Sequence, residues 1–121
     1  MTRPSDESVR ARLRERGAAE HVVLGGAGKL IEDWRRFVQQ VEAGYPFGLD
    51  DYRNDLDIRA LIEAAGLGEQ VADEDRRLRG ALTRPEIAVW STDVPNAFWV
   101  RGYPANASGE LLADLKARAG V

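Results

Sequence analysis

The chain contains no cysteine, and this absence excludes disulfides, cysteine-ligated zinc and a thiol nucleophile. No apolar run approaches the roughly 20 residues that a membrane-spanning helix needs, so the sequence predicts no membrane partner. The first residues also lack the apolar segment of a secretory signal. A cytoplasmic protein is the simplest expectation for such a chain.

Sequence motifs for catalysis are lacking as well. The glycine-rich stretch 25–29 departs from the P-loop pattern at Val23 and Leu30, and from the dinucleotide-binding pattern at Ile31. We expect this stretch to be a flexible loop before a helix. His21 is the only histidine, and no serine has the sequence setting of a nucleophile elbow. The sequence therefore predicts no cofactor and no catalytic residue.

Charge is distributed unevenly along the chain. The net charge is −3, although arginine supplies 15 of the 17 basic residues. Between Glu32 and Asp75 there are 12 acidic and 4 basic residues, whereas the two flanks together hold 8 acidic and 13 basic residues. The basic flanks could neutralise the acidic middle within the fold, or an acidic face could meet a basic partner. The sequence leaves both interpretations open.

Hydrophobic spacing predicts one mainly α-helical domain over residues 1–121, with four or five helices and a small β-hairpin packed on the bundle. Residues 1–17 are expected to form a helical arm with Ser5 as its N-cap; whether the arm is a surface helix or a frayed end stays open. The remaining predicted elements are helices over 29–43, from an N-cap at Asp50 or Asp51 to about 65, over 70–82 and over 109–119, and strands over 87–90 and 97–101.

The two central helices are expected to form the core. Trp34 is predicted to be buried between them. In the next predicted helix, over 70–82, the charged residues of the run 73–79 are expected to face outward. The predicted inner face of the second central helix consists of Tyr52, Leu56, Ile58, Leu61, Ile62 and Ala65.

The predicted hairpin offers a candidate interaction site. Strand alternation over 97–101 places Phe98 and Val100 on one face and Trp99 and Arg101 on the other. An exposed tryptophan beside an arginine is typical of a protein-binding anchor. We therefore take as candidate interaction residues Trp99 and Arg101, together with the acidic residues Asp50, Asp51 and Asp57.

Two alternative functions depend on other residues. Asp51 and Asp55 are four apart on a predicted helix, where two carboxylates could share a hard cation in a small metal-dependent enzyme. Asp55 also has Arg59 one turn later, in the favourable order for an ion pair. The second alternative is weak nucleic-acid binding, although the acidic net charge disfavours it. It would use an arginine-rich arm whose side chains spread around the helix, namely Arg10, Arg12, Arg14 and Arg16.

The pattern W-x-x-F-V-x-x-V-E-x-G-Y-x-F-x-L-D-D-Y-x-N-D-L-D-x-R runs over residues 34–59. It resembles the core of a small family of uncharacterised bacterial proteins, and the resemblance covers about residues 21–62. The resemblance implies a bacterial origin, and it implies no activity, ligand or site residue.

The sequence as a whole favours a non-catalytic protein-interaction module, such as an adaptor or an immunity- or antitoxin-like inhibitor. Its partner would be another protein, a basic one if the acidic middle is the contact face. Self-association of the chain is the other form that such an interaction could take.

Overall fold

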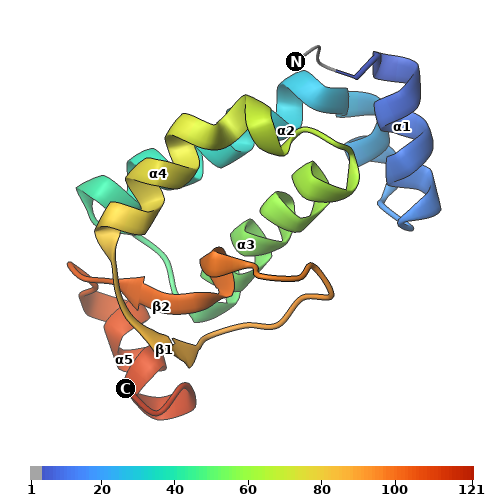
Figure 1. Cartoon of the computed structure of the whole chain (residues 1–121). Coiled ribbons are helices and arrows are strands. Elements are labelled where there is room, and N and C mark those ends of the chain that lie inside the picture. Colours follow the sequence, from blue (N-terminus) through green and yellow to red (C-terminus); the bar gives the residue numbers. More distant parts are fainter. Residues whose placement is uncertain (1–3) are drawn as a thin grey trace.

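The computed structural model describes residues 4–121 (Figure 1). Within that range the chain forms five α-helices and a two-stranded antiparallel sheet, which confirms the predicted fold class. Among these residues, no helix combines the length and the apolarity that a bilayer crossing requires. The elements are α1 (Asp6–Glu15), α2 (Glu20–Ala43), α3 (Leu49–Ala64), α4 (Ala72–Ala81), β1 (Leu82–Ala88), β2 (Arg101–Pro104) and α5 (Gly109–Arg118).

The N-terminal arm is a packed helix. Ser5 is its N-cap as predicted, because the Ser5 hydroxyl accepts a hydrogen bond from the Ser8 amide at 3.2 Å. Val9 and Leu13 are fully buried, and α1 contacts both α2 and α3. These contacts fix the arm to the core and rule out a frayed arm over residues 4–17. Residues 1–3 of the predicted arm lie outside the described residues.

Helix α2 begins earlier than the spacing of its apolar residues indicated. It starts at Glu20 and passes through the glycine-rich stretch 25–29, so the prediction of a flexible loop there is wrong. Gly26 has a φ of 65° and bends the helix at this point, a conformation that glycine adopts at little cost. Gly26, with a ψ of −162°, interrupts the helical backbone, and the buried Val23 and Ala27 hold the helical segments on either side of it against the core.

Aromatic side chains from α2, the following turn and α3 form the centre of the core. Trp34 is fully buried, as predicted, and it stacks on Phe37 with ring centroids 5.0 Å apart. Phe37 also contacts Tyr45 and Tyr52 at 5.7 and 5.4 Å. Such offset and edge-to-face aromatic pairs add stability beyond the area they bury.

The start of α3 is capped from another helix. Asp50 and Asp51 lie inside the first turn, and neither is the N-cap, so that prediction is wrong. Instead the Leu49 amide donates to the Asp114 carboxylate of α5 at 3.0 Å. A carboxylate at this position satisfies a free amide and also favours the positive end of the helix dipole.

The sheet is shifted relative to the predicted hairpin. Strands β1 and β2 pair antiparallel with Thr83 opposite Tyr103 and Ala88 opposite Arg101, and they lie beside α5 at the lower left of Figure 1. Residues predicted as the second strand instead form a 3₁₀ turn, η2 (Phe98–Val100). Gly102 has a φ of 77°, and a Cβ there would lie 2.5 Å from the Thr83 carbonyl oxygen, so this position requires glycine.

Candidate functional site

The largest buried polar cluster lies where α2, α3 and α4 meet. We call it the Arg59 network and define it as Arg59, Asp75, Glu63 and Trp34. The Asp75 carboxylate accepts hydrogen bonds from Arg59 Nη2 at 2.8 Å and from Trp34 Nε1 at 3.0 Å. Arg59 Nη1 also donates to Glu63 at 3.0 Å, so the predicted Asp55–Arg59 ion pair is wrong. Because these charges satisfy one another, the network stabilises the fold and offers no free group for chemistry.

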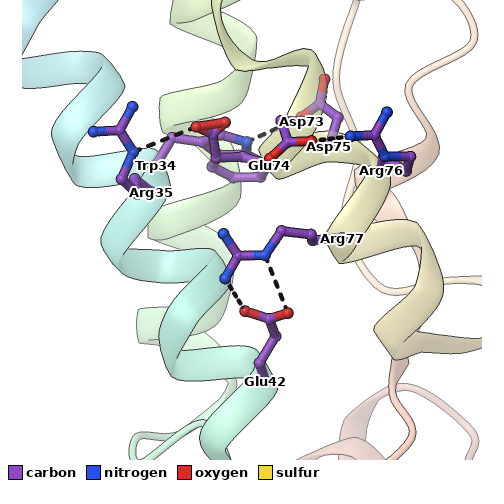
Figure 2. Close-up of polar contacts among 8 residues, drawn as sticks. All are labelled: Trp34, Arg35, Glu42, Asp73, Glu74, Asp75, Arg76 and Arg77. Atoms are coloured by element: carbon purple, nitrogen blue, oxygen red, sulfur yellow. Dashed lines mark hydrogen bonds and ion pairs between the residues drawn. The ribbon is translucent and has the colours of Figure 1, made fainter.

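The acidic run of α4 takes part in the same contact (Figure 2). Glu74 is buried and its carboxylate accepts from Arg35 Nε of α2 at 3.3 Å. Further along the two helices, Arg77 pairs with Glu42. The prediction that run 73–79 faces outward is therefore wrong for Glu74 and Asp75. Helix α4 packs directly on α2, where Glu74 meets Arg35, and Asp75 meets Arg59 of α3.

Trp99 is not an exposed anchor. Its side chain is only 4% exposed, and the Arg59 guanidinium lies 4.7 Å above the centre of its ring. The prediction failed because it assumed strand alternation, whereas the η2 turn directs Trp99 into the core. Arg101 is exposed, but it donates to the Pro85 carbonyl at 3.0 Å and so connects the two strands. The two side chains therefore do not form a joint surface.

The three acidic candidates on α3 are all exposed, and they differ in their contacts. Asp50 pairs with Arg118 of α5 at 2.9 Å, and this hydrogen bond and the nearby charge lower the pKa of the Asp50 carboxyl. Asp57 accepts from Trp90 Nε1 at 2.7 Å. Within residues 4–121, neither Asp51 nor Asp57 forms an ion pair.

Asp51 and Asp55 are close enough to affect one another, but they form an incomplete metal site. Asp55 accepts a hydrogen bond from the Tyr45 hydroxyl at 2.6 Å. Burial raises the pKa of Asp55, the hydrogen bond from Tyr45 opposes this shift, and the carboxylates of Asp51 and Asp33 add to it. In the part of the chain that the structure describes, no three acidic, histidine or cysteine side chains gather to hold a metal ion.

The arginines of the N-terminal arm are engaged within the fold. Arg12 Nη1 donates to the Ala65 carbonyl at 3.2 Å, and Arg10 Nη2 donates to the Leu24 carbonyl at 3.4 Å. The other two form ion pairs, Arg14 with Glu20 and Arg16 with Asp93. These contacts direct the four guanidinium groups to separate places, so they do not form one cationic stripe for a phosphate backbone.

Because two tyrosines are buried in the core, we expect the fold to lose stability at alkaline pH. Burial raises the pKa of Tyr45 and Tyr52, and the hydrogen bond to Asp55 raises that of Tyr45 further. The unfolded chain therefore ionises first, and stability that is fully present below about pH 10 is lost above it, by about 1.4 kcal/mol per tyrosine at pH 11. Urea unfolding at pH 8 and 11 measures the free energy of unfolding that is lost between the two pH values. This loss should be smaller in Tyr52→Phe than in the unchanged chain, by the amount expected for one tyrosine. Equal losses in the two chains would contradict a raised pKa of Tyr52 in the folded state.

A hollow between α2 and α3 is the best-formed candidate binding site. We call it the α2–α3 groove; its volume is about 350 Å³, and it is more enclosed than the hollows beside Asp57 and Arg101. Four of its seven lining side chains are apolar and three are polar. The lining residues are Val22, Leu30, Ile58 and Leu61, with His21, Lys29 and Asp33.

A second hollow of about 320 Å³ adjoins the groove, because Leu61 lines both. Its other walls include Asp57 of α3, Ala18 of the α1–α2 connection and Thr92 of the loop after β1. On α3, Asp57 and Ala60 line the second hollow, Ile58 lines the groove, and Leu61 lies between them. A further hollow of about 490 Å³ beside Arg101 is more open and is lined by the loop 92–98 and the residues that follow it.

Ile58 and Leu61 were assigned to the inner face of α3, and this prediction is confirmed only in part, because both pack against the core without being fully buried. Both are half-buried and border the groove, whereas Tyr52, Leu56 and Ile62 are fully buried. Ile58 follows Leu56 by two residues, and residues two apart on a helix do not face the same way. An apolar stripe too wide for one face was thus the signal for a second apolar surface.

The chain matches no protein-family model, and comparison with curated proteins and with solved structures finds no similar chain.

Proposed function

We propose that this chain is a non-catalytic protein-interaction module, an adaptor or an immunity- or antitoxin-like inhibitor, that binds a segment of another protein in the α2–α3 groove. The observation that carries the proposal is the apolar lining of the groove. Ile58 and Leu61 stay partly exposed on a helix whose other large apolar side chains are buried. Apolar side chains that line a concave surface are typical of binding sites.

The second hollow beside the groove supports a polypeptide ligand. The two hollows share Leu61 as a wall, with Asp57 lining one and Ile58 the other, so one polypeptide could contact both. Amphipathic helices bind such grooves by inserting side chains spaced three or four residues apart. The volume of about 350 Å³ is at the lower end for a drug-sized ligand, and it suits one or two inserted side chains.

The alternatives receive less support from the contacts. A metal-dependent reaction would have to proceed at Asp51 and Asp55, where Asp55 is already bound to the Tyr45 hydroxyl. Nucleic-acid binding would require the arm arginines to leave partners such as Ala65 and Asp93. The groove needs no such rearrangement, because its lining is already open to a ligand.

The proposal predicts that binding depends on Ile58 and Leu61. Peptides would be selected from a random phage-displayed library against the immobilised chain. We expect Ile58→Ser/Leu61→Ser to weaken their binding at least tenfold, about 1.4 kcal/mol, as measured by fluorescence anisotropy. In ¹⁵N-labelled chain, the amide shifts that move on binding should lie in 21–33 and 57–61.

The matched control for this prediction is Phe47→Ser. Phe47 is also an exposed apolar residue, but it lies in the turn before α3 and does not line either hollow. It should leave the affinity unchanged, and circular dichroism should show that both variants fold. Selected peptides that bind the groove variant as tightly as the unchanged chain would refute the proposal, as would a library that yields no binder.

A further inference from the structure

We infer that the segment bound in the α2–α3 groove is cationic, with apolar side chains flanked by lysine or arginine. This inference rests on the proposed function and specifies the chemistry of the partner. It follows from the carboxylates that surround the groove. Asp33 is part of the groove wall, Asp57 lines the adjoining hollow one turn before Leu61, and Asp55 lies one turn before Ile58 on α3. Asp51 precedes Asp55 by one further turn.

Three of these carboxylates lack a basic partner among the described residues. In residues 4–121, no ion pair involves Asp51, Asp55 or Asp57. The hydrogen bonds to Asp55 and Asp57 come from the neutral Tyr45 hydroxyl and the neutral Trp90 indole. The other acidic residues of α3 differ, because Asp50 pairs with Arg118 and Glu63 pairs with Arg59.

The basic groups around the groove are already engaged. Lys29 pairs with Asp33, and Arg36 lies 3.8 Å from the same carboxylate. Arg53, one turn before Asp57, donates to the Val89 carbonyl at 2.8 Å and covers the Trp90 ring. The α3 side of the groove therefore keeps an excess of negative charge.

Mutual repulsion among the carboxylates favours a cation. The charges of Asp51 and Asp33 raise the pKa of Asp55 in addition to the larger effect of burial. A lysine or arginine placed between these groups would relieve the repulsion. A partner without such a group would cover carboxylates and leave them without compensation, which costs free energy. The same charges repel a phosphate backbone or an anionic lipid surface, so a basic protein segment fits best.

The test uses the same random peptide library. Selected peptides should be enriched in lysine and arginine next to apolar residues, and their affinity should fall as salt is raised. Asp51→Asn/Asp55→Asn/Asp57→Asn should weaken binding at least tenfold. An asparagine side chain can still accept the hydrogen bonds that Asp55 and Asp57 receive, so these substitutions remove charge while keeping the contacts.

The control variant is Asp73→Asn/Glu86→Gln/Glu110→Gln, which removes the same number of charges at exposed positions that line neither hollow. It should bind the peptides like the unchanged chain. Equal weakening in both variants would mean that only net charge matters and would overturn a localised cation site.

The remaining outcomes separate the inference from the proposed function. Uncharged or acidic peptides that still require Ile58 and Leu61 would overturn the cationic partner and leave the interaction module in place. Peptides whose affinity does not change in Ile58→Ser/Leu61→Ser would overturn the groove as the binding site. A dimer in light scattering that Ile58→Ser/Leu61→Ser dissociates would show that a second copy occupies the groove, and this too would overturn the inference.

Discussion

Replacing Asp75 with asparagine will lower the free energy of unfolding by about 3–5 kcal/mol, a large share of the stability of a small domain. Asp75 is the principal counter-charge of Arg59, whose side chain is 5% exposed. The neutral amide cannot balance the guanidinium charge, and Glu63, whose side chain is 47% exposed, remains as its counter-charge. A buried charge that loses its buried partner is far more costly than an absent ion pair. Urea unfolding followed by tryptophan fluorescence measures the change.

Two further variants test this explanation. Asp73→Asn removes a neighbouring carboxylate that pairs with Arg76 on the surface of α4 (Figure 2), and its denaturation midpoint should hardly change. Arg59→Met/Asp75→Leu removes both charges, and it should recover most of the stability that Asp75→Asn loses. An Asp75→Asn variant with the midpoint of the unchanged chain would show that the Arg59 charge is not confined to the protein interior.

The central helices could be predicted from the sequence because their apolar residues repeat with the helical period. Trp34 and Phe37 belong to that pattern, and both are buried. The ends of the elements were less accurate. Helix α2 extends nine residues earlier than predicted, because Val23 and Ala27 continue the buried side through a bend at Gly26. Local composition favoured a loop there, and packing on α1 overrides that preference.

Errors in the candidate site came from contacts between distant parts of the chain. The orientation of Trp99 depends on the η2 turn and on Arg59, which lies 40 residues earlier in the sequence. Burial of Glu74 likewise depends on Arg35 from another helix. Neither contact has a local signature. The exposure of Ile58, in contrast, could have been recognised from its position two residues after Leu56.

Neutralisation within the fold accounts for part of the uneven charge. Ion pairs between the acidic middle and the basic flanks, such as Asp50 with Arg118 and Glu42 with Arg77, neutralise charge within the fold. Asp51 and Asp57 have no such partner among the described residues. Summed charge along a sequence cannot distinguish these groups, because the distinction depends on which helix faces lie together. The groove itself is lined by Ile58 and Leu61 of α3, and the carboxylate in its wall, Asp33, is paired with Lys29.

Trp34→Ala will also lower the free energy of unfolding by about 3–5 kcal/mol, through a different mechanism. The indole is fully buried against Phe37, so its loss removes apolar contacts and leaves a cavity that the surrounding helices fill only in part. Its Nε1 also donates to Asp75. The variant therefore combines a packing defect with a lost hydrogen bond.

Trp34→Phe separates the two contributions. It keeps an aromatic ring in the core and removes the indole N–H, so the loss attributable to the hydrogen bond should be about 1 kcal/mol. Because Trp34 and Asp75 are in contact, the effects of Trp34→Phe and Asp75→Asn should not add in a double-mutant cycle. Additive effects would mean that the two groups stabilise the fold independently. A Trp34→Ala variant with an unchanged denaturation midpoint would remove this residue from the core altogether.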